Sequence, residues 1–210
     1  MSLLSLTRRG LGRPAVPLLA RATHSSYRPI SPESVAKEDA EYEAKIQAAE
    51  QAVADMGFPR LSVFRQPVSW GDHDQFQHVN NAHYIRWFET ARMRWIERVT
   101  STMRPELRDN LALGRGVGII LASTYCRYRR PVTYPDTVVI GSAPYPLRRR
   151  DRFVIKEVAY SVNQRAMVAE ADFDCVGYDY DKLCKATLPD DLVAAMEMWQ
   201  YTGAGSDKKR

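Results

Sequence analysis

Residues 81–100 carry the strongest helical pattern in the sequence. Large apolar side chains recur there at the three- and four-residue spacing of one helix face: Tyr84, Phe88, Ala91, Trp95 and Val99. A helix with so broad an apolar face must be buried against another element. The remaining segments of the chain therefore decide the fold, because they must supply the surface that covers this helix.

Four segments after this helix are typical of β-strands, since they are rich in β-branched and aromatic residues and are separated by turn signals. They are residues 117–130, 136–146, 152–162 and 165–178. A further strand is predicted from Leu61 through Val68 toward Trp70, where Pro67 argues for an edge or a bulge. This order predicts an α+β fold in which one antiparallel sheet wraps around a single long central helix.

Other helices are expected besides the central one. Residues 35–56 are free of Gly and Pro and are followed by Gly57 and Pro59, which predicts a helix with an apolar stripe that packs on the domain or on a partner. Residues 105–113 are a candidate short helix, and residues 188–200 a candidate closing helix. The domain boundaries expected from these patterns are 29–59 for an N-terminal helical extension, 60–186 for the central domain, and 187–210 for a C-terminal helix and tail.

The first 28 residues have the composition of a mitochondrial transit peptide. They contain no acid and are rich in hydroxyl side chains. Their arginines are Arg8, Arg9, Arg13, Arg21 and Arg28. We therefore expect residues 1–28 to direct the protein to the mitochondrial matrix. The alternative is a basic tail with no targeting role.

The charge balance excludes several classes of function. The whole chain has 30 Lys+Arg and 25 Asp+Glu, and without the five arginines of residues 1–28 the two totals are equal. A basic surface that would attract nucleic acid is therefore not expected. The sequence contains no run of about eighteen or more apolar residues, so a membrane-spanning helix is not predicted. The three cysteines form no CxxC pair, and nothing in the pattern suggests a metal site or a cofactor.

The most informative motif precedes the helix at 81–100. The segment from Asp72 to Tyr84, with Glu89 to Arg92, resembles the pattern Asp-x-x-x-His-Val-Asn-Asn-x-x-Tyr followed by Glu-x-Ala-Arg. That pattern belongs to the 4-hydroxybenzoyl-CoA thioesterase-like hot-dog superfamily, and the likeness is greatest to its acyl-CoA and acyl-carrier-protein thioesterases. Matching positions are Asp74, His78, Val79, Asn80, Asn81, Tyr84, Glu89, Ala91 and Arg92. Gln77 stands where many relatives have glycine.

This resemblance implies a hot-dog fold and the hydrolysis of a thioester, without a cofactor or a metal. It assigns Asp74 as the carboxylate, acting either as general base for water or as nucleophile through an anhydride. Unpaired N–H groups near Asn80 and Asn81 would stabilise the oxyanion at the start of the helix. His78 and Glu89 are the other candidate catalytic residues.

Each candidate also has a purely structural interpretation. Asp and Asn side chains are preferred in turns and as helix caps, so Asn81 is more simply a cap than a catalyst. His78 either positions the acyl group or anchors the loop by a hydrogen bond. Glu89 either faces the site or forms an ion pair with Arg92, three residues later.

Coenzyme A would bring phosphates to the site. The run Arg148, Arg149 and Arg150, with Arg152, is one candidate to receive them, and Arg127, Arg129 and Arg130 are another. A charge run is also typical of a solvated turn. The family implies at least a dimer or a tetramer, with sites built from two subunits.

Two functions compete on this evidence. The first is an acyl-CoA or acyl-carrier-protein thioesterase of the mitochondrial matrix. The second is a non-catalytic hot-dog protein that serves as a structural subunit of a large mitochondrial complex. A hot-dog enoyl hydratase fits poorly, because the hydratases carry Asp-x-Asn-Pro-x-His, and the chain lacks the Asn-Pro and has one residue fewer between Asp74 and His78.

Overall fold

The computed structural model describes residues 31–203 and contains four α-helices among them. The helices are α1 (Pro32–Asp55), α2 (Asn81–Thr100), α3 (Pro105–Leu113) and α4 (Asp190–Glu197). The strands are β1 (Val63–Pro67), β2 (Val117–Tyr128), β3 (Thr137–Pro144), β4 (Arg152–Ser161), β5 (Ala166–Asp179) and β6 (Cys184–Lys185). Short 3-10 turns occupy Arg60–Ser62 and Trp70–Asp72.

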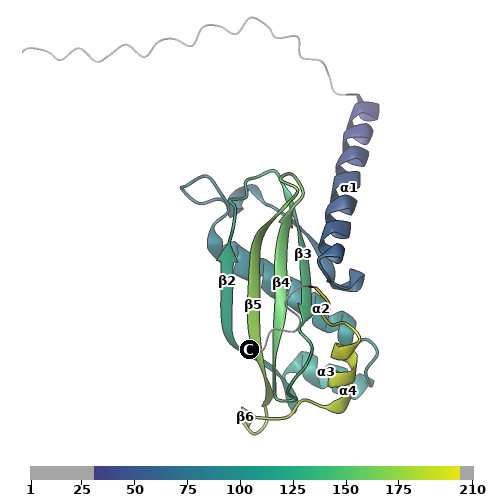
Figure 1. Ribbon diagram of the computed structural model, residues 1–210, viewed down its shortest axis with the longest axis vertical. Coiled ribbons are helices and arrows are strands. Elements are labelled where there is room, and N and C mark those ends of the chain that lie inside the picture. The colour runs from purple at the N-terminus through teal and green to yellow at the C-terminus, as the bar shows by residue number, and fades with distance from the viewer. Residues whose placement is uncertain (1–30, 204–210) are drawn as a thin grey trace, which may run out of the picture.

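The strands form one antiparallel sheet in the order β1-β3-β4-β5-β2, and β6 pairs with β5. The sheet curls around α2, while α1 lies on its other side (Figure 1). This confirms the predicted α+β architecture with one long central helix. β1 lies at an edge of the sheet, as Pro67 indicates, although the strand begins at Val63 because a 3-10 turn occupies the preceding residues.

Alternating side chains of the sheet supply two separate apolar cores. Val138 and Ile140 on β3 belong to the core that contains α2, whereas Val139, between them, belongs to the core that contains α1. In the α2 core, Phe88 and Phe173 meet edge to face with their ring centroids 5.9 Å apart. The period of two along a strand thus makes both faces of β3 apolar, and both are buried.

The helix α1 is an added element on the outer face of the sheet. It begins after the N-cap Ser31, whose side chain accepts a hydrogen bond from the Ser34 N–H at 3.2 Å. Its buried residues Ile46, Ala49 and Val53 pack there with β3 and β4. The expectation that the helix over residues 35–56 packs on the domain is therefore confirmed.

The C-terminal helix α4 packs into the same core as α2, through Leu192, Val193, Ala195 and Met196. It is shorter than the predicted 188–200 segment, because Pro189 is its N-cap and the helix ends at Glu197. The expected transit peptide at 1–28 lies outside the described residues. Among residues 31–203, no helix has both the length and the apolar character needed to cross a membrane.

The strand β2 forms the other edge of the sheet. It pairs with β5 on one side only, and its central residues are exposed. Its exposed apolar side chains are Ile120, Leu121, Tyr125 and Tyr128. A 12-residue edge with so much exposed apolar surface is the kind that associates with another strand.

Candidate active site

The loop that precedes α2 folds tightly around Asp74. The backbone N–H of Asp74 donates to the carbonyl of His78 at 3.0 Å, and the N–H of Gln77 donates to the carbonyl of Asp74 at 3.1 Å. The carboxylate oxygen Oδ1 of Asp74 accepts the N–H of Phe76 at 2.8 Å. One oxygen of the carboxylate is therefore fixed by the turn that it caps.

The second oxygen of this carboxylate has no such partner. Asp74 is half-buried, and its Oδ2 makes no hydrogen bond or ion pair with any residue between 31 and 203. A carboxylate that is oriented through one oxygen and open at the other is suited to take a proton from water or to attack a carbonyl carbon. The turn role that was an alternative for Asp74 is therefore present, and it leaves an oxygen available.

Gln77 adopts a left-handed backbone conformation, with φ at 64°. This region disfavours residues with a Cβ atom and favours glycine. It gives a physical reason for the glycine that many relatives have at this position. This chain adopts the conformation with glutamine.

The start of α2 corrects the expected cap. Asn80, rather than Asn81, is the N-cap, and its side chain accepts the N–H of Ala82 at 2.9 Å. The N–H of Asn80 donates to the carbonyl of Asp72 at 2.9 Å, so it is not free to bind an oxyanion. The N–H of Asn81 makes no hydrogen bond in the described part of the chain. It is a donor at the positive end of the helix dipole.

The histidines of this segment hold the loop in place. The Nδ1 atom of His78 lies 3.2 Å from the carbonyl oxygen of Val79, which fits the loop-anchoring alternative. His73, which the sequence did not single out, accepts the N–H of Tyr134 through Nε2 at 2.7 Å. His83 Nδ1 lies 3.5 Å from Asp72 Oδ1.

A tyrosine that sequence reasoning missed completes this junction. The hydroxyl of Tyr128, at the end of β2, donates to the carbonyl oxygen of Asn81 at 3.1 Å. The ring of Tyr128 also meets that of Tyr84 edge to face. The alternation along β2 places Tyr128 on the same face as Cys126, which packs against the α2 core. The two-residue spacing of Cys126 and Tyr128 in the sequence was therefore a signal that Tyr128 faces α2.

Glu89 is not brought next to Asp74 within one chain. It is exposed, and it lies about 12 Å along the helix axis from Asn81. The ion pair with Arg92, one of the two alternatives for Glu89, is absent from the described residues, and Arg92 Nη1 lies 3.7 Å from Oε2 of Glu157 instead. Alternation along β4 turns Glu157 toward α2, and the period of two in this strand was a signal for its position.

The Arg92–Glu157 pair is buried in the α2 core. Glu157 is fully buried and accepts a hydrogen bond from Ser142 Oγ at 2.6 Å. Burial raises the pKa of Glu157 to about 8, although Arg92 and Ser142 partly offset the increase. Arg92 Nη1 and Glu157 Oε2 have no hydrogen-bond partner among residues 31–203. The Arg92 guanidinium also lies over the ring of Phe173, 4.3 Å from its centroid.

The two arginine groups lie at opposite ends of the sheet. Pro67 of β1 pairs with Thr137, so the loop of Asp74 emerges at the Thr137 end of β3, whereas Arg148 to Arg150 follow its other end, about 24 Å away. Arg149 pairs with Asp151 and Arg150 with Asp190. The run 148–150 and Asp74 of the same chain therefore do not form one site.

The second arginine group lies at the Asp74 end. The chain after Arg130 is tied to the loop by the Val79 N–H, which donates to the Val132 carbonyl at 2.8 Å. Arg129 pairs with Glu170. The Arg130 backbone N–H donates to the Val168 carbonyl at 3.2 Å, whereas its side chain is exposed and has no hydrogen bond or ion pair within residues 31–203.

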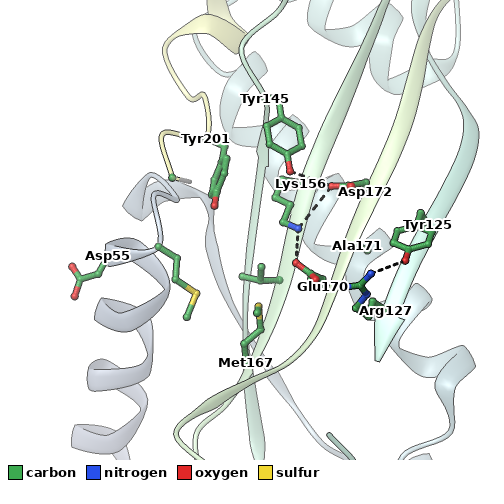
Figure 2. Close-up of a pocket in the computed structure, with 13 residues that line it drawn as sticks. Asp55, Tyr125, Arg127, Tyr145, Lys156, Met167, Glu170, Ala171, Asp172 and Tyr201 are labelled. Carbon is green, nitrogen blue, oxygen red and sulfur yellow. Dashed lines mark hydrogen bonds and ion pairs between the residues drawn. The ribbon is translucent and has the colours of Figure 1, made fainter. Parts of the chain in front are cut away.

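A cavity of about 530 Å³ opens on the outer face of the sheet, away from Asp74 (Figure 2). Its floor holds an ion-pair group, in which Lys156 Nζ lies 2.8 Å from Glu170 Oε2 and 3.9 Å from Asp172 Oδ1. Tyr145 and Tyr201 border it on the α1 side. The described residues contain no group of three or more His, Cys, Asp or Glu side chains that could hold a metal ion.

Comparisons with known proteins point to one family. Residues 68–196 match the model of the thioesterase-like superfamily. A search of curated protein sequences finds no match to the chain.

Solved structures give the same answer for the fold. A protein of Pseudomonas aeruginosa strain PAO1 is 23% identical with a TM-score of 0.56, and the match covers 67% of this chain and 92% of that one. A 1,4-dihydroxy-2-naphthoyl-CoA thioesterase from Synechocystis is 15% identical with a TM-score of 0.55, covering 64% and 93%. A Pseudomonas aeruginosa protein provisionally assigned as a thioesterase is 25% identical with a TM-score of 0.53, covering 64% and 97%.

Proposed function

The chain belongs to the thioesterase-like superfamily and has its hot-dog fold, and from that membership we propose that it hydrolyses an acyl thioester of coenzyme A or of an acyl carrier protein. One observation carries the proposal: Asp74 keeps an open carboxylate oxygen in the same loop-helix junction where Asn81 keeps an unpaired N–H. Thioester hydrolysis needs a base or nucleophile and an oxyanion donor, and the junction supplies both.

In the general-base route, Asp74 takes a proton from water while the water oxygen attacks the thioester carbonyl carbon. The carbonyl oxygen becomes an oxyanion, and the Asn81 N–H at the start of α2 stabilises it. When the tetrahedral intermediate collapses, the C–S bond breaks and the thiolate leaves with the proton held by Asp74. The products are the free acid and the thiol.

In the nucleophilic route, Asp74 attacks the carbonyl carbon itself and forms a mixed anhydride, which water then hydrolyses. A single turnover in ¹⁸O-labelled water detects the nucleophilic route when water attacks the Asp74 carbonyl of the anhydride. The nucleophilic route with attack of water on the Asp74 carbonyl leaves the label in the protein, whereas the general-base route leaves it only in the acid.

We assign His78 a structural role, because its Nδ1 lies against the Val79 carbonyl. Glu89 lies about 12 Å along α2 from Asn81 of the same chain. A catalytic role for Glu89 therefore requires a second subunit that brings the substrate to it.

A homodimer formed along β2 fits the exposed apolar edge of that strand. Two copies related by a two-fold axis would pair their β2 strands antiparallel and continue the sheet from one subunit to the next. Such a pair brings the Arg148–Arg150 end of one subunit toward the Asp74 end of the other. Arg130, which is free of ion pairs in the described residues, is the candidate for a coenzyme A phosphate within the same chain.

We also propose that the protein works in the mitochondrial matrix, because of the acid-free and arginine-rich composition of residues 1–28. Fusion of these residues to a fluorescent reporter tests this. Reporter fluorescence in mitochondria is the expected result, and a cytosolic signal would contradict it.

The test of the activity is thiol release from a panel of acyl-CoAs, by the full chain and by the chain without residues 1–28. We expect Asp74→Asn to lower kcat by roughly 10²- to 10⁴-fold, the usual contribution of a positioned base, with an unchanged melting temperature. Asp72→Asn is the matched control, since the Asp72 side chain accepts the Ser69 N–H and an amide oxygen still accepts it. This control should keep most of the activity.

Two results would overturn the proposal in different ways. Full activity of Asp74→Asn would leave a hydrolase but remove Asp74 from its site. No turnover of any acyl-CoA or acyl-carrier-protein substrate would remove the enzyme. Co-sedimentation with a large mitochondrial complex would then support the structural-subunit alternative.

A further inference from the structure

A second, smaller cavity lies on the α2 side of the sheet, between α3, the start of β2 and the start of α4. Its volume is about 240 Å³. Leu107, Leu111, Val117 and Leu192 are among the apolar side chains that line it, and Arg115, its one charged lining residue, is itself exposed. A mostly apolar pocket of this kind is suited to hold a hydrocarbon group.

Within one subunit this cavity is far from the catalytic loop. It lies at the Val117 end of β2, whereas Tyr128 at the other end of β2 contacts Asn81. The 12 residues of β2 separate the two ends by roughly 36 Å. Figure 1 shows α3 and α4 at the end of the sheet where β6 lies. An acyl group bound at Asp74 cannot reach the cavity of its own chain.

The antiparallel pairing of two β2 strands removes this separation. A two-fold axis between Ala122 and Ser123, at the middle of β2, places Val117 of one copy opposite Tyr128 of the other. Because the cavity and the loop of Asp74 lie on the same side of the sheet, the cavity of one subunit then adjoins the catalytic loop of its partner. The site of each subunit is incomplete without the other copy.

We propose that the acyl group of a thioester held at Asp74 of one subunit occupies the α3–α4 cavity of the other subunit. This rests on the proposed thioesterase function and on the β2 dimer. The cavity is mostly apolar, and at about 30 Å³ for each water-sized group its 240 Å³ hold about eight methylene groups. The preferred substrate is therefore an unsubstituted aliphatic acyl thioester of about eight carbons.

The size prediction is tested with straight-chain acyl-CoAs and the full chain. We expect kcat/KM to rise from acetyl-CoA to octanoyl-CoA and to fall for palmitoyl-CoA. Leu111→Trp should fill the cavity and lower kcat/KM for octanoyl-CoA at least about tenfold, with acetyl-CoA changed less than about twofold. Leu113→Trp is the matched control, because Leu113 is on the same helix, is 63% exposed and does not line the cavity. Unchanged octanoyl-CoA hydrolysis by Leu111→Trp would overturn the proposal.

A mixed dimer tests whether the cavity acts on the other subunit. One chain carries Asp74→Asn and the other Leu111→Trp, with different affinity tags so that only heterodimers are purified. If the cavity serves the partner, one of the two sites combines an intact Asp74 with an open cavity. The heterodimer then hydrolyses octanoyl-CoA at about half the wild-type rate, although both mutant homodimers are slow.

The other outcomes are equally informative. A heterodimer as inactive as the two mutant homodimers would place the cavity and Asp74 of one chain in the same site, and would overturn the proposal. Full activity of the Asp74→Asn homodimer would instead remove Asp74 from the site, as in the test of the proposed function. If Leu111→Trp unfolds or loses the dimer in gel filtration, Leu107→Phe replaces it in both experiments.

Discussion

The loop of residues 72–81 and the pair of Arg92 with Glu157 place charged side chains in opposite environments. In the loop, the carboxylates of Asp72 and Asp74 are half-buried and accept hydrogen bonds from nearby backbone N–H groups. In the core, Glu157 is fully buried, and its closest charge is a guanidinium nitrogen 3.7 Å away that makes no hydrogen bond to it.

This difference separates two uses of the same chemical groups. A carboxylate that is held by local backbone donors and still reaches water can serve in a reaction without a large cost to folding. A carboxylate in an apolar core pays a desolvation penalty that an imperfect ion pair does not repay. We therefore expect changes in the loop to affect the rate of the proposed reaction, and changes at Glu157 to affect stability and its dependence on pH.

The largest effect expected from this contrast is the dependence of the free energy of unfolding on pH that Glu157 produces. Its folded pKa is about 8, above its ordinary value, because burial disfavours the charged form. Below the unfolded pKa both states are protonated. Between that value and about 8 only the folded state holds the proton, so the free energy of unfolding falls as pH rises, by a few kcal/mol across this window.

Glu157→Gln removes this titration and should flatten the change in melting temperature between pH 5 and pH 8. Chemical unfolding at several pH values measures the difference between variant and wild type. Glu106→Gln, at an exposed position on α3, is the control and should leave the wild-type slope unchanged. Parallel plots of the free energy of unfolding against pH for wild type and Glu157→Gln would show that Glu157 is charged in the folded and the unfolded state. Glu157 would then not differ from the carboxylates of the loop.

Local periodicity explains why much of the fold could be predicted. The helix over 81–100 matches α2 at both ends, and its apolar face is the one that is buried. Four strands were predicted to within two residues at every end. The two-residue β6 was not predicted, because so short a segment has no period to detect.

The candidate site was predicted only as far as a local motif reaches. The spacing of Asp74 and His78 marked the loop, and the loop is tight and precedes the helix as expected. The partner of Arg92 depends on how a distant strand is placed, so the local sequence offered only the nearby Glu89 as an alternative, and that alternative is wrong. The cap was placed one residue late, since Asn80 and Asn81 are chemically equivalent in sequence and differ only in backbone conformation.

The cap gives the next prediction in order of size. Asn80→Ala removes the acceptor for the Ala82 N–H and should lower the free energy of unfolding by about 1 kcal/mol. Asn81→Ala is the matched control, because the Asn81 side chain is exposed and makes no hydrogen bond within the described residues. Urea unfolding of both variants measures the difference. A larger loss for Asn81→Ala than for Asn80→Ala would move the cap back to Asn81.

The smallest effect tests whether the loop carries strain of its own. Gln77 has φ at 64°, a conformation that costs a residue with a Cβ roughly 1–2 kcal/mol. Glycine removes that cost but loses about 0.4–1 kcal/mol through the greater freedom of its unfolded chain. Gln77→Gly should therefore raise the free energy of unfolding by about 0.5–1 kcal/mol, the balance of these two contributions.

The same substitution separates strain from catalysis. The hydrogen bond from the residue 77 N–H to the Asp74 carbonyl does not depend on the side chain, so the loop should keep its shape and thiol release should stay within about twofold of wild type. Gln75→Gly is the matched control: it lies in the same exposed loop without a positive φ, and it should lose stability by roughly the entropy cost alone. A loss of stability in Gln77→Gly equal to that in Gln75→Gly would mean that the Gln77 side chain contributes contacts that offset its backbone strain, and the loop would then resemble the core in depending on side-chain packing.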